Sequence, residues 1–274
     1  MSTTIEKAIY NRSSLLLGDD TTNRMESVRV LLFGVGGVGS WCAEGLVRSG
    51  VTNITLVDSD TVCITNVNRQ AMALPSTVGK IKVEVLKDRL LSINPNANIT
   101  ALQKIFSKET ADEFDMDSYD YIIDAVDSLK DKAELILRAT QTRAEFFSSM
   151  GAALKVDPTK VRVAEFWDVK GCPLGAALRK KLKRAKTYPA HKFLCVYDEE
   201  VLPNRGENKV CKLSADMCPK IQAAEDGQVQ AWCETKAQTN GSLAHITAIF
   251  GMTICGLIIS DIYNKTLASQ MQQQ

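Results

Sequence analysis

The sequence predicts an α/β protein with a Rossmann-like, mainly parallel sheet and helices on both faces, extended by antiparallel strands and a C-terminal helix. Apolar runs alternate with helical stretches over the first two-thirds of the 274-residue chain, a rhythm typical of parallel sheets with right-handed crossovers. A glycine-rich turn joins the first run to a helix, and beyond residue 151 apolar and polar residues alternate instead. We expect a single domain with a core of residues 1–152 and an extension of residues 153–274.

The expected elements of the core follow from their apolar patterns. Residues 28–33 (VRVLLF) are continuously apolar, as a strand buried on both faces should be. Residues 80–93 place their apolar side chains on one face of a helix. By the same patterns we expect strands at residues 53–57, 98–102, 121–125 and 145–149, and helices at 39–49 and 128–142.

The extension has weaker patterns. Residues 160–169 (KVRVAEFWDV) alternate as an antiparallel strand does, and residues 193–197 predict another strand. We expect residues 199–239 to form a mobile loop and residues 269–274 a frayed tail. The apolar residues 243–260 are about as long as the shortest membrane span. We interpret them as a buried core helix, with peripheral membrane association as the alternative.

Composition restricts the class of protein. The formal net charge of +1 carries no information about nucleic acid, so any site for a polyanion must be a local basic patch. The eight cysteines form no CxxC pair, and no apolar signal sequence opens the chain. We therefore expect free thiols in a reducing cytoplasm, with Cys42 and Cys255 as small core residues.

A glycine-rich turn indicates a nucleotide site. Four glycines in the motif GVGGVG lie between the first strand and the following helix: Gly34, Gly36, Gly37 and Gly39. Glycine allows a sharp turn and a close approach of a phosphate, and the helix N-terminus offers free N–H groups. Asp58 ends the next strand, where a carboxylate can bind ribose hydroxyls. These residues suit NAD as well as ATP.

Charged residues after the turn favour a triphosphate. Arg69, near the end of the motif TNVNRQ, and Lys82 can neutralise β- and γ-phosphates, which NAD does not offer in this form. Asp124 and Asp127 follow a predicted strand at the sheet's carboxyl edge, where a carboxylate can hold Mg²⁺ on phosphate oxygens. Each residue also has a structural interpretation, such as a loop cap, an ion pair or a solvated helix position.

Together these motifs resemble those of the ThiF/MoeB-like superfamily, which includes the ubiquitin-activating enzymes. The resemblance rests on the segments GVGGVGSW, LVDSDTVCITNVNRQ, VGKIKVEV, SINPNA and YIIDAVDS. It implies adenylation of a carboxylate with Mg-ATP and release of pyrophosphate. The residues that it implies for ATP are Gly34, Gly36, Gly37, Gly39, Asp58, Asp60, Asn66, Arg69, Lys82 and Asp127, with Asp127 also at the Mg²⁺. Arg12 matches an N-terminal arginine that reaches a partner's phosphates, which implies a homodimer.

Within this superfamily the chain is most similar to the family of tRNA threonylcarbamoyladenosine dehydratases. The segments GSWCAEGLVRSGV, NVNRQ, MGAALKVDPTKV and DVKGCPLGAALRKKLKRA carry this resemblance. It implies ATP-dependent cyclisation of threonylcarbamoyladenosine beside the tRNA anticodon, with net loss of water. The cysteine that some members carry before the last helix is not matched here, where Cys233 is the nearest thiol. The paired zinc cysteines of many MoeB-like enzymes are also missing, so no structural zinc is expected.

A basic segment is the candidate tRNA contact. Residues 179–192 contain no acidic residue, and six cations lie close together: Arg179, Lys180, Lys181, Lys183, Arg184 and Lys186. Such a block can bind the phosphate backbone of an anticodon loop, with Tyr188, His191 and Phe193 stacking on an unpaired base. The alternative is a solvated helix face.

Three other functions remain open on the sequence. The chain could adenylate a ubiquitin-like sulfur-carrier protein, although the basic segment argues against it. It could be an NAD-dependent oxidoreductase, against which Arg69, Lys82 and Asp127 argue. It could also be a nucleotide-gated adaptor for a sulfur-transfer partner, such as a cysteine desulfurase or sulfur-acceptor system.

Overall fold

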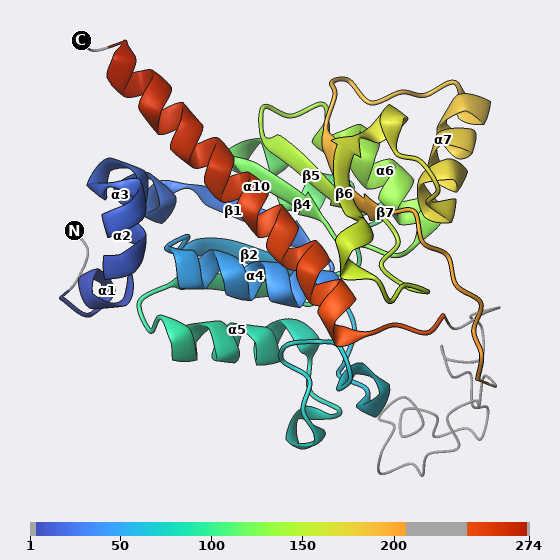
Figure 1. Ribbon diagram of the computed structural model, residues 1–274, viewed down its shortest axis with the longest axis horizontal. Helices are drawn as coiled ribbons and strands as arrows, with labels where there is room; N and C mark the ends of the chain where they lie inside the picture. Colours follow the sequence, from blue (N-terminus) through green and yellow to red (C-terminus); the bar gives the residue numbers. More distant parts are fainter. Residues whose placement is uncertain (1–3, 207–239, 273–274) are drawn as a thin grey trace.

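A seven-stranded sheet forms the centre of the molecule in the computed structural model, which describes residues 4–206 and 240–272 (Figure 1). The strand order is β3-β2-β1-β4-β5-β7-β6, in which β6 alone is antiparallel to its neighbour. The strands are β1 (Arg29–Phe33), β2 (Asn53–Val57), β3 (Asn98–Leu102), β4 (Tyr121–Asp124), β5 (Glu145–Ser149), β6 (Val161–Glu165) and β7 (Leu194–Asp198). This confirms the predicted fold class.

Helices cover both faces of the sheet. The α-helices are α1 (Thr4–Ile9), α2 (Asn11–Leu17), α3 (Asp19–Ser27), α4 (Gly37–Ser49), α5 (Lys82–Ile93), α6 (Leu129–Ala139), α7 (Pro173–Ala185) and α10 (Ala244–Met271). Short 3₁₀ turns are η1 (Ile64–Asn66), η2 (Pro75–Thr77), η3 (Ala111–Phe114), η4 (Met116–Ser118), η5 (Pro158–Lys160) and η6 (Phe166–Asp168).

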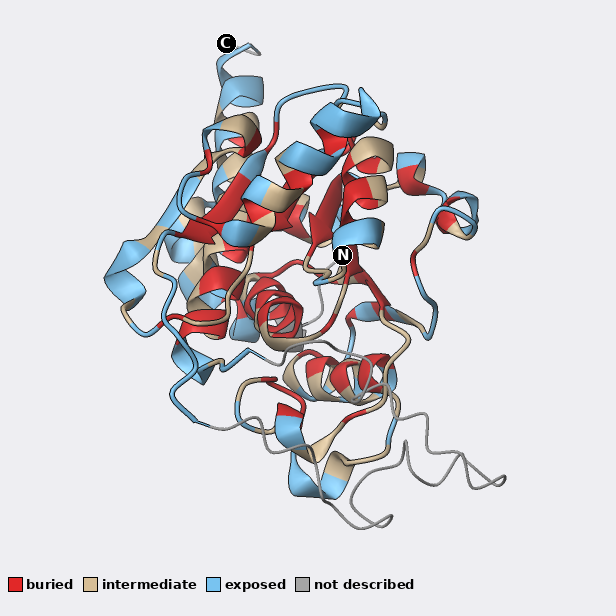
Figure 2. Ribbon diagram, turned by 90° about the vertical axis from the view of Figure 1, so that its right-hand side faces the viewer, coloured by how far each residue is buried: buried red, intermediate tan, exposed pale blue. Residues whose placement is uncertain are grey.

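Alternate residues of β1 pack into two separate hydrophobic cores, one on each face of the sheet. Val30 and Leu32 of β1 pack with α3, α4, α5 and α10, whereas Leu31 and Phe33 pack with α6, α7 and η3. All four side chains are at most 1% exposed. The strands therefore lie buried between two helical layers, which explains their continuous apolar runs (Figure 2).

The long helix α10 is a core helix on one side. Its buried residues recur at every fourth position, and α10 crosses α4 so closely that a Cβ at Gly251 would clash with the carbonyl oxygen of Val38. Its length and hydropathy would also suit a membrane span, but 44% of that stretch is buried inside the protein. The buried face agrees with the interpretation as a core helix.

Several boundaries differ from the prediction. β6 ends at Glu165 rather than at residue 169, because η6 follows and the Glu165 carboxylate accepts a hydrogen bond from Trp167 N (2.8 Å). α10 continues to Met271, so the tail expected from residue 269 was wrong for its first three residues. Helices α1 to α3 were not predicted. The loop expected at residues 199–239 lies largely outside the described residues.

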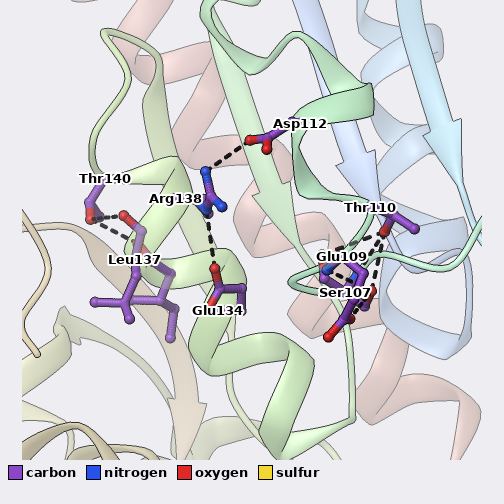
Figure 3. A network of polar contacts seen from close by, with 9 residues as sticks. Ser107, Glu109, Thr110, Asp112, Glu134, Leu137, Arg138 and Thr140 are labelled. Carbon is purple, nitrogen blue, oxygen red and sulfur yellow. Dashed lines mark hydrogen bonds and ion pairs between the residues drawn. The ribbon is translucent and has the colours of Figure 1, made fainter. Parts of the chain in front are cut away.

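A polar network holds the connection between β3 and β4 against α6. The Arg138 guanidinium contacts Glu134 on its own helix (3.1 Å) and Asp112 of η3 (2.9 Å), as Figure 3 shows. Within the connection, the hydroxyl of Thr110 accepts a hydrogen bond from Ser107 N (2.9 Å). The loop is thereby held beside the carboxyl end of β3, where it borders the candidate site.

Candidate active site

The four glycines of the turn between β1 and α4 have different structural roles. Gly34 has φ +85° and lies so close to β4 that a Cβ would stand 2.7 Å from the Ala125 carbonyl oxygen. A Cβ at Gly39 would clash with the Gly34 carbonyl oxygen, and one at Gly37 would stand 3.0 Å from Thr247. Only a Cβ at Gly36 would have room, its nearest neighbour being Gln70 Nε2 at 3.8 Å. Gly36 and the first amides of α4 therefore offer the surface that a phosphate can approach.

Asp58 ties the turn to β2. Its Oδ2 accepts a hydrogen bond from Val35 N and its Oδ1 accepts one from Asp60 N, both at 2.9 Å. A carboxylate has about four lone-pair positions, so two remain for a ligand hydroxyl. Asp58 therefore both shapes the turn and stays suitable for ribose.

Lys82 and Asp60 are paired with each other. The Lys82 ammonium lies 2.9 Å from Asp60 Oδ2, and Lys82 is 5% exposed. The backbone N–H of Lys82 also donates to the Asp60 carbonyl oxygen (3.0 Å). A buried ammonium needs such a partner, and two of its three protons remain for other acceptors.

Residues 65–71 form a loop that places Arg69 at the carboxyl edge. Arg69 Nη1 donates to the Thr65 carbonyl oxygen (2.8 Å) and to Asn68 Oδ1 (3.0 Å). Burial lowers the pKa of Arg69, while the nearby Asp127 carboxylate acts in the opposite direction. The guanidinium stays protonated at neutral pH, because its ordinary pKa is above 12. The Asp127 carboxylate is thus near enough to Arg69 to act on its charge, whereas the phosphate roles of both residues stay predictions.

The same loop is fastened to α4 and α10. Trp41 Nε1 donates to the Arg69 carbonyl oxygen (3.0 Å), and Ala71 N donates to the hydroxyl of Ser40 (3.1 Å). The Asn68 amide donates to the Ser242 carbonyl oxygen (2.9 Å) just before α10. The hydrogen bond of Trp41 therefore fixes the position of residues 65–71 relative to α4, the helix that begins at the glycine turn. Sequence patterns did not single out this contact.

Asp124 and Asp127 have different surroundings. Asp124 is fully buried, 2.7 Å from the Lys132 ammonium, and accepts a hydrogen bond from the Ser148 hydroxyl (2.7 Å). The expectation that Asp124 could hold Mg²⁺ was wrong, because burial and these partners close it off. Asp127 is exposed. A single exposed carboxylate fits Mg²⁺, which keeps most of its ligands as phosphate oxygens and water.

This geometry can be compared with known proteins. The model of the ThiF family matches residues 10–269. The chain belongs to the ThiF family. Two relatives, both named tRNA threonylcarbamoyladenosine dehydratase, are the Haemophilus influenzae protein (32% identical, covering 90% of each chain) and the Escherichia coli protein (31% identical, covering 96% of this chain and 95% of the relative).

A crystal structure of the E. coli dehydratase TcdA in complex with ATP has a TM-score of 0.78 to this ThiF-family chain, with 27% identity over 100% of both. The E. coli molybdopterin-synthase adenylyltransferase is 30% identical, but the match covers 60% of this chain and 65% of that protein. The H. influenzae and E. coli dehydratases therefore match the extension as well as the core.

In this ThiF-family protein Arg12 lies far from the glycine turn of its own chain. The neighbouring Tyr10 hydroxyl donates to the Val47 carbonyl oxygen at the end of α4 (2.8 Å) and accepts from Asn94 after α5 (2.9 Å). The glycine turn lies at the other end of α4, a helix of 13 residues, so the separation is about 20 Å. Arg12 is exposed. Arg12 therefore does not reach the candidate site of its own chain.

A cavity beside Asp58 was not predicted. It has a volume of about 390 Å³ and is lined by Ser59, Gln103, Lys104, Ile105, Thr110 and Glu113. It lies at the carboxyl end of β3, next to the strand that ends before Asp58. Because ligands of open α/β sheets bind beyond the carboxyl ends of the strands, residues 103–105 could have been inferred from the predicted strand 98–102.

Asn66 serves the loop itself in this structure. Its Oδ1 accepts a hydrogen bond from Cys63 N (3.0 Å), and the residue is 8% exposed. A phosphate contact by Asn66 stays a prediction.

The described thiols are mostly core residues. Cys42, Cys172, Cys195 and Cys255 are buried, and burial raises the pKa of Cys42 and Cys195 and that of Cys255 to about 12. This confirms the interpretation of Cys42 and Cys255. Cys211, Cys218 and Cys233 lie outside the described residues. Among residues 4–206 and 240–272, no three His, Cys, Asp or Glu side chains form a metal-binding group, so the absence of zinc stays an expectation.

The basic segment forms the second half of α7 and the residues that follow it. Leu178 and Leu182 are buried, whereas Lys180, Lys181, Lys183, Arg184 and Lys186 are exposed. None of these five has an ion pair within the described part of the chain. Arg179 is half-buried, and its guanidinium donates to the Phe166 carbonyl oxygen (3.0 Å). The expected stacking by Phe193 was wrong, because it is 4% exposed and packs on Phe146 and Phe166.

Proposed function

We propose that this protein is an ATP-dependent tRNA threonylcarbamoyladenosine dehydratase that adenylates the threonyl carboxylate and then closes the ring. One observation carries the proposal: the dehydratases of H. influenzae and E. coli match 90% and 96% of the chain and that of Bacillus subtilis is 41% identical over 64% of it, whereas the E. coli adenylyltransferase is 30% identical over 60%. Most of the extension is therefore shared with the H. influenzae and E. coli dehydratases. Cytoplasmic tRNA would be the substrate.

The nucleotide is proposed to lie along the carboxyl edge. The open side at Gly36 and the first amides of α4 would receive the phosphates, and the free lone pairs of Asp58 the ribose. The cavity lined by Gln103 and Ile105 would then receive the adenine, because it adjoins Asp58 and Ile105 is 56% exposed. Gly34, Gly37 and Gly39 would act by allowing close packing.

Cations would stabilise the charge that develops on the leaving pyrophosphate. Arg69, held by Trp41, and Lys82 would do so from the same chain, together with Asn66 as a hydrogen-bond donor. Asp60 would keep Lys82 in place. Mg²⁺ held by Asp127 would supply further neutralisation of the triphosphate when bound.

The chemical step is a displacement at phosphorus. A carboxylate oxygen of the threonyl group attacks the α-phosphate, and the bond to pyrophosphate breaks. A nucleophile of the same nucleoside then attacks the activated carbonyl, AMP leaves, and a proton is released. The substrate loses the elements of one water. Catalysis of this kind depends on positioning and on fixed charges, so no protein nucleophile is needed.

A homodimer is proposed to complete the site. Arg12 lies about 20 Å from its own glycine turn, so it would reach the phosphates of a partner subunit. Beside it on α2, Leu15 and Leu16 are 79% and 80% exposed. On α10, Ile249, Met252, Gly256 and Tyr263 are spaced by three, four and seven residues and are not fully buried, a pattern typical of helix pairing. A second copy would cover these apolar groups.

The extension is proposed to face tRNA. Residues 153–206 carry twelve Lys and Arg but six Asp and Glu, whereas residues 1–152 carry sixteen and twenty. A local excess of cations attracts a polyanion even when the chain as a whole is nearly neutral. We also propose, as a secondary partner, the cysteine desulfurase or sulfur-acceptor system expected from the sequence.

The proposal is tested by incubating the protein with ATP, Mg²⁺ and threonylcarbamoylated tRNA, followed by mass analysis of the nucleosides. The expected result is loss of one water from the modified adenosine, with AMP and pyrophosphate formed in equal amounts. Unchanged nucleoside in a protein that binds ATP would contradict the proposal. Pyrophosphate exchange that depends on a carrier protein ending in Gly-Gly would instead favour the second candidate, adenylation of a sulfur carrier.

A further inference from the structure

The exposed cations of α7 lie at the edge of the sheet opposite the candidate active site. α7 begins beside Gly151 at the carboxyl end of β5, where a Cβ would stand 3.7 Å from Leu174. After α7, Ala190 N donates to the hydroxyl of Thr140 (3.0 Å), which follows α6 at the amino edge. Figure 1 shows α7 running between these two edges. A helix of 13 residues is about 20 Å long, so the last turn of α7 is far from the glycine turn.

Aromatic rings accompany the cations at this amino edge. Trp167 of η6 and Tyr188 have ring centroids 6.1 Å apart, and Lys183 Nζ lies 5.5 Å from the centroid of the Trp167 ring. Tyr188 is 58% exposed and Trp167 is partly exposed. On α7, Lys180, Lys183 and Arg184 share one exposed face through their spacing of three and four. Rings flanked by unpaired cations are the usual composition of a single-stranded RNA site.

The backbone at Lys186 adds an independent observation. Lys186 has φ 55° and ψ 31°, and Thr187 N donates to the Leu182 carbonyl oxygen (3.1 Å), so the helix ends in a Schellman-type cap. Glycine is the residue that favours this left-handed position, and a side chain there is strained. A lysine at this position is explained if its charge serves binding rather than folding.

We infer that Trp167, Lys180, Lys183, Arg184, Lys186 and Tyr188 form a second RNA site, here called the distal patch, which binds the tRNA several nucleotides away from the reacting adenosine. The inference rests on the proposed function. It assigns the basic segment to a part of the tRNA away from the reacting adenosine. Stacked nucleotides advance about 3.4 Å each, so a separation of the order of a helix length corresponds to several nucleotides. Lysine and arginine would hold phosphates, and the exposed ring of Tyr188 would stack on an unpaired base.

A positional experiment tests this directly. A photo-crosslinking phenylalanine analogue replaces Tyr188, and the crosslinked nucleotides of the modified tRNA are mapped. Crosslinks several nucleotides from the threonylcarbamoyladenosine are expected. Crosslinks to that adenosine or its immediate neighbours, or no crosslink to a tRNA that the protein converts, would overturn the distal patch.

Kinetics provide the second measurement. Lys183→Glu with Arg184→Glu should raise KM for full-length tRNA by about tenfold or more and reduce the salt slope of binding by about two, with kcat unchanged. For a short oligonucleotide centred on the modified adenosine, the variant and the wild type should be alike. Equal losses on both RNAs would place the patch at the reacting nucleotide, and unchanged KM on both would remove its role. Lys7→Glu on α1, at the other side of the molecule, is the control for reversing one exposed cation outside the patch.

Lys186→Gly separates binding from folding. It should keep or raise the melting temperature, because glycine accepts the left-handed backbone, while tRNA binding weakens. Weaker folding with unchanged tRNA binding would assign Lys186 to the fold. If the wild type converts no RNA at all, the proposed function fails, whereas conversion that is insensitive to all these variants contradicts the distal patch alone.

Discussion

The core and the extension handle charge differently. At the carboxyl edge of the core, Lys82 is paired with Asp60 and Lys132 with Asp124, both at under 3 Å. On α7 of the extension and at Lys186 just after it, five exposed cations have no ion pair within the described residues. Buried charges must be paired to be tolerated, whereas exposed ones can stay available for a polyanion. The comparison indicates that the core uses charge to hold a preorganised site and the extension uses it to attract a substrate.

The largest expected effects concern Arg69 and Asp127 at the carboxyl edge, where we propose that the phosphates bind. Arg69→Ala and Asp127→Ala should each reduce kcat by about 10²-fold or more, because each removes charge stabilisation in the transition state. Turnover of modified tRNA measures this, with circular dichroism to show that the fold is kept. Arg69→Lys is the matched control, which keeps the charge but loses the planar fork. Full activity in both alanine variants would refute the phosphate assignments.

Breaking the buried pair should affect stability most. Lys132→Met leaves the Asp124 carboxylate buried without its cation, at a cost of about 3–5 kcal/mol, and lowers the melting temperature by about 10 °C. Adding Asp124→Leu should recover part of the loss, because both charges are then gone. A melting temperature unchanged by Lys132→Met would mean that the core does not depend on pairing. The same substitution made at exposed Lys183 should have little effect on melting.

Mixing two inactive variants tests whether one chain supplies every residue of its own active site. Arg12→Ala and Arg69→Ala subunits, mixed in equal amounts and allowed to exchange, should regain about a quarter of wild-type turnover. Half of the dimers would be mixed, and each mixed dimer would have one intact site. No recovery despite exchange, verified by tagged subunits, would place Arg12 outside the partner's site.

The smallest effect is expected at the base of the extension. Hydrogen bonds from Val156 N (2.6 Å) and from Lys160 (2.9 Å) lower the pKa of Glu200 to about 2. The charged form therefore stabilises the fold above the ordinary pKa near 4.5, and this contribution is lost as the pH falls toward 2. Glu200→Gln should lower the melting temperature slightly at pH 7 and leave it closer to the wild type at pH 3. An equal difference at both pH values would contradict this origin.

Much of the core was predictable because its signals are local. The glycine turn, the strand ending before Asp58 and the loop that carries Arg69 are each contained in short segments, and their order along a βαβ unit places them at one edge. Asp124 could not be told from Asp127 in this way. The two lie three residues apart, and burial beside Lys132 and Ser148 depends on packing between β4, α6 and β5.

For the extension, the sequence predicted composition but not position in the fold. Its basic segment was evident from composition alone, but the sequence could not say which edge of the sheet the segment would occupy. Phe193 and Trp167 illustrate the same limit, because an aromatic residue next to a basic run can be buried in the core or turned outward. Here the contact of Phe193 with Phe146 and Phe166 decided the outcome.

By itself, the sequence determined the fold class, the nucleotide turn and the presence of a basic helix, because periodicity, glycine spacing and charge runs act over a few residues. Only the tertiary structure decided that Trp41 holds Arg69, that Asp124 is closed off, that Arg12 is about 20 Å from its own site and that α7 carries its charge to the far edge. These facts depend on which distant segments touch, and contacts between distant segments are set by the packing of the whole core rather than by any local pattern.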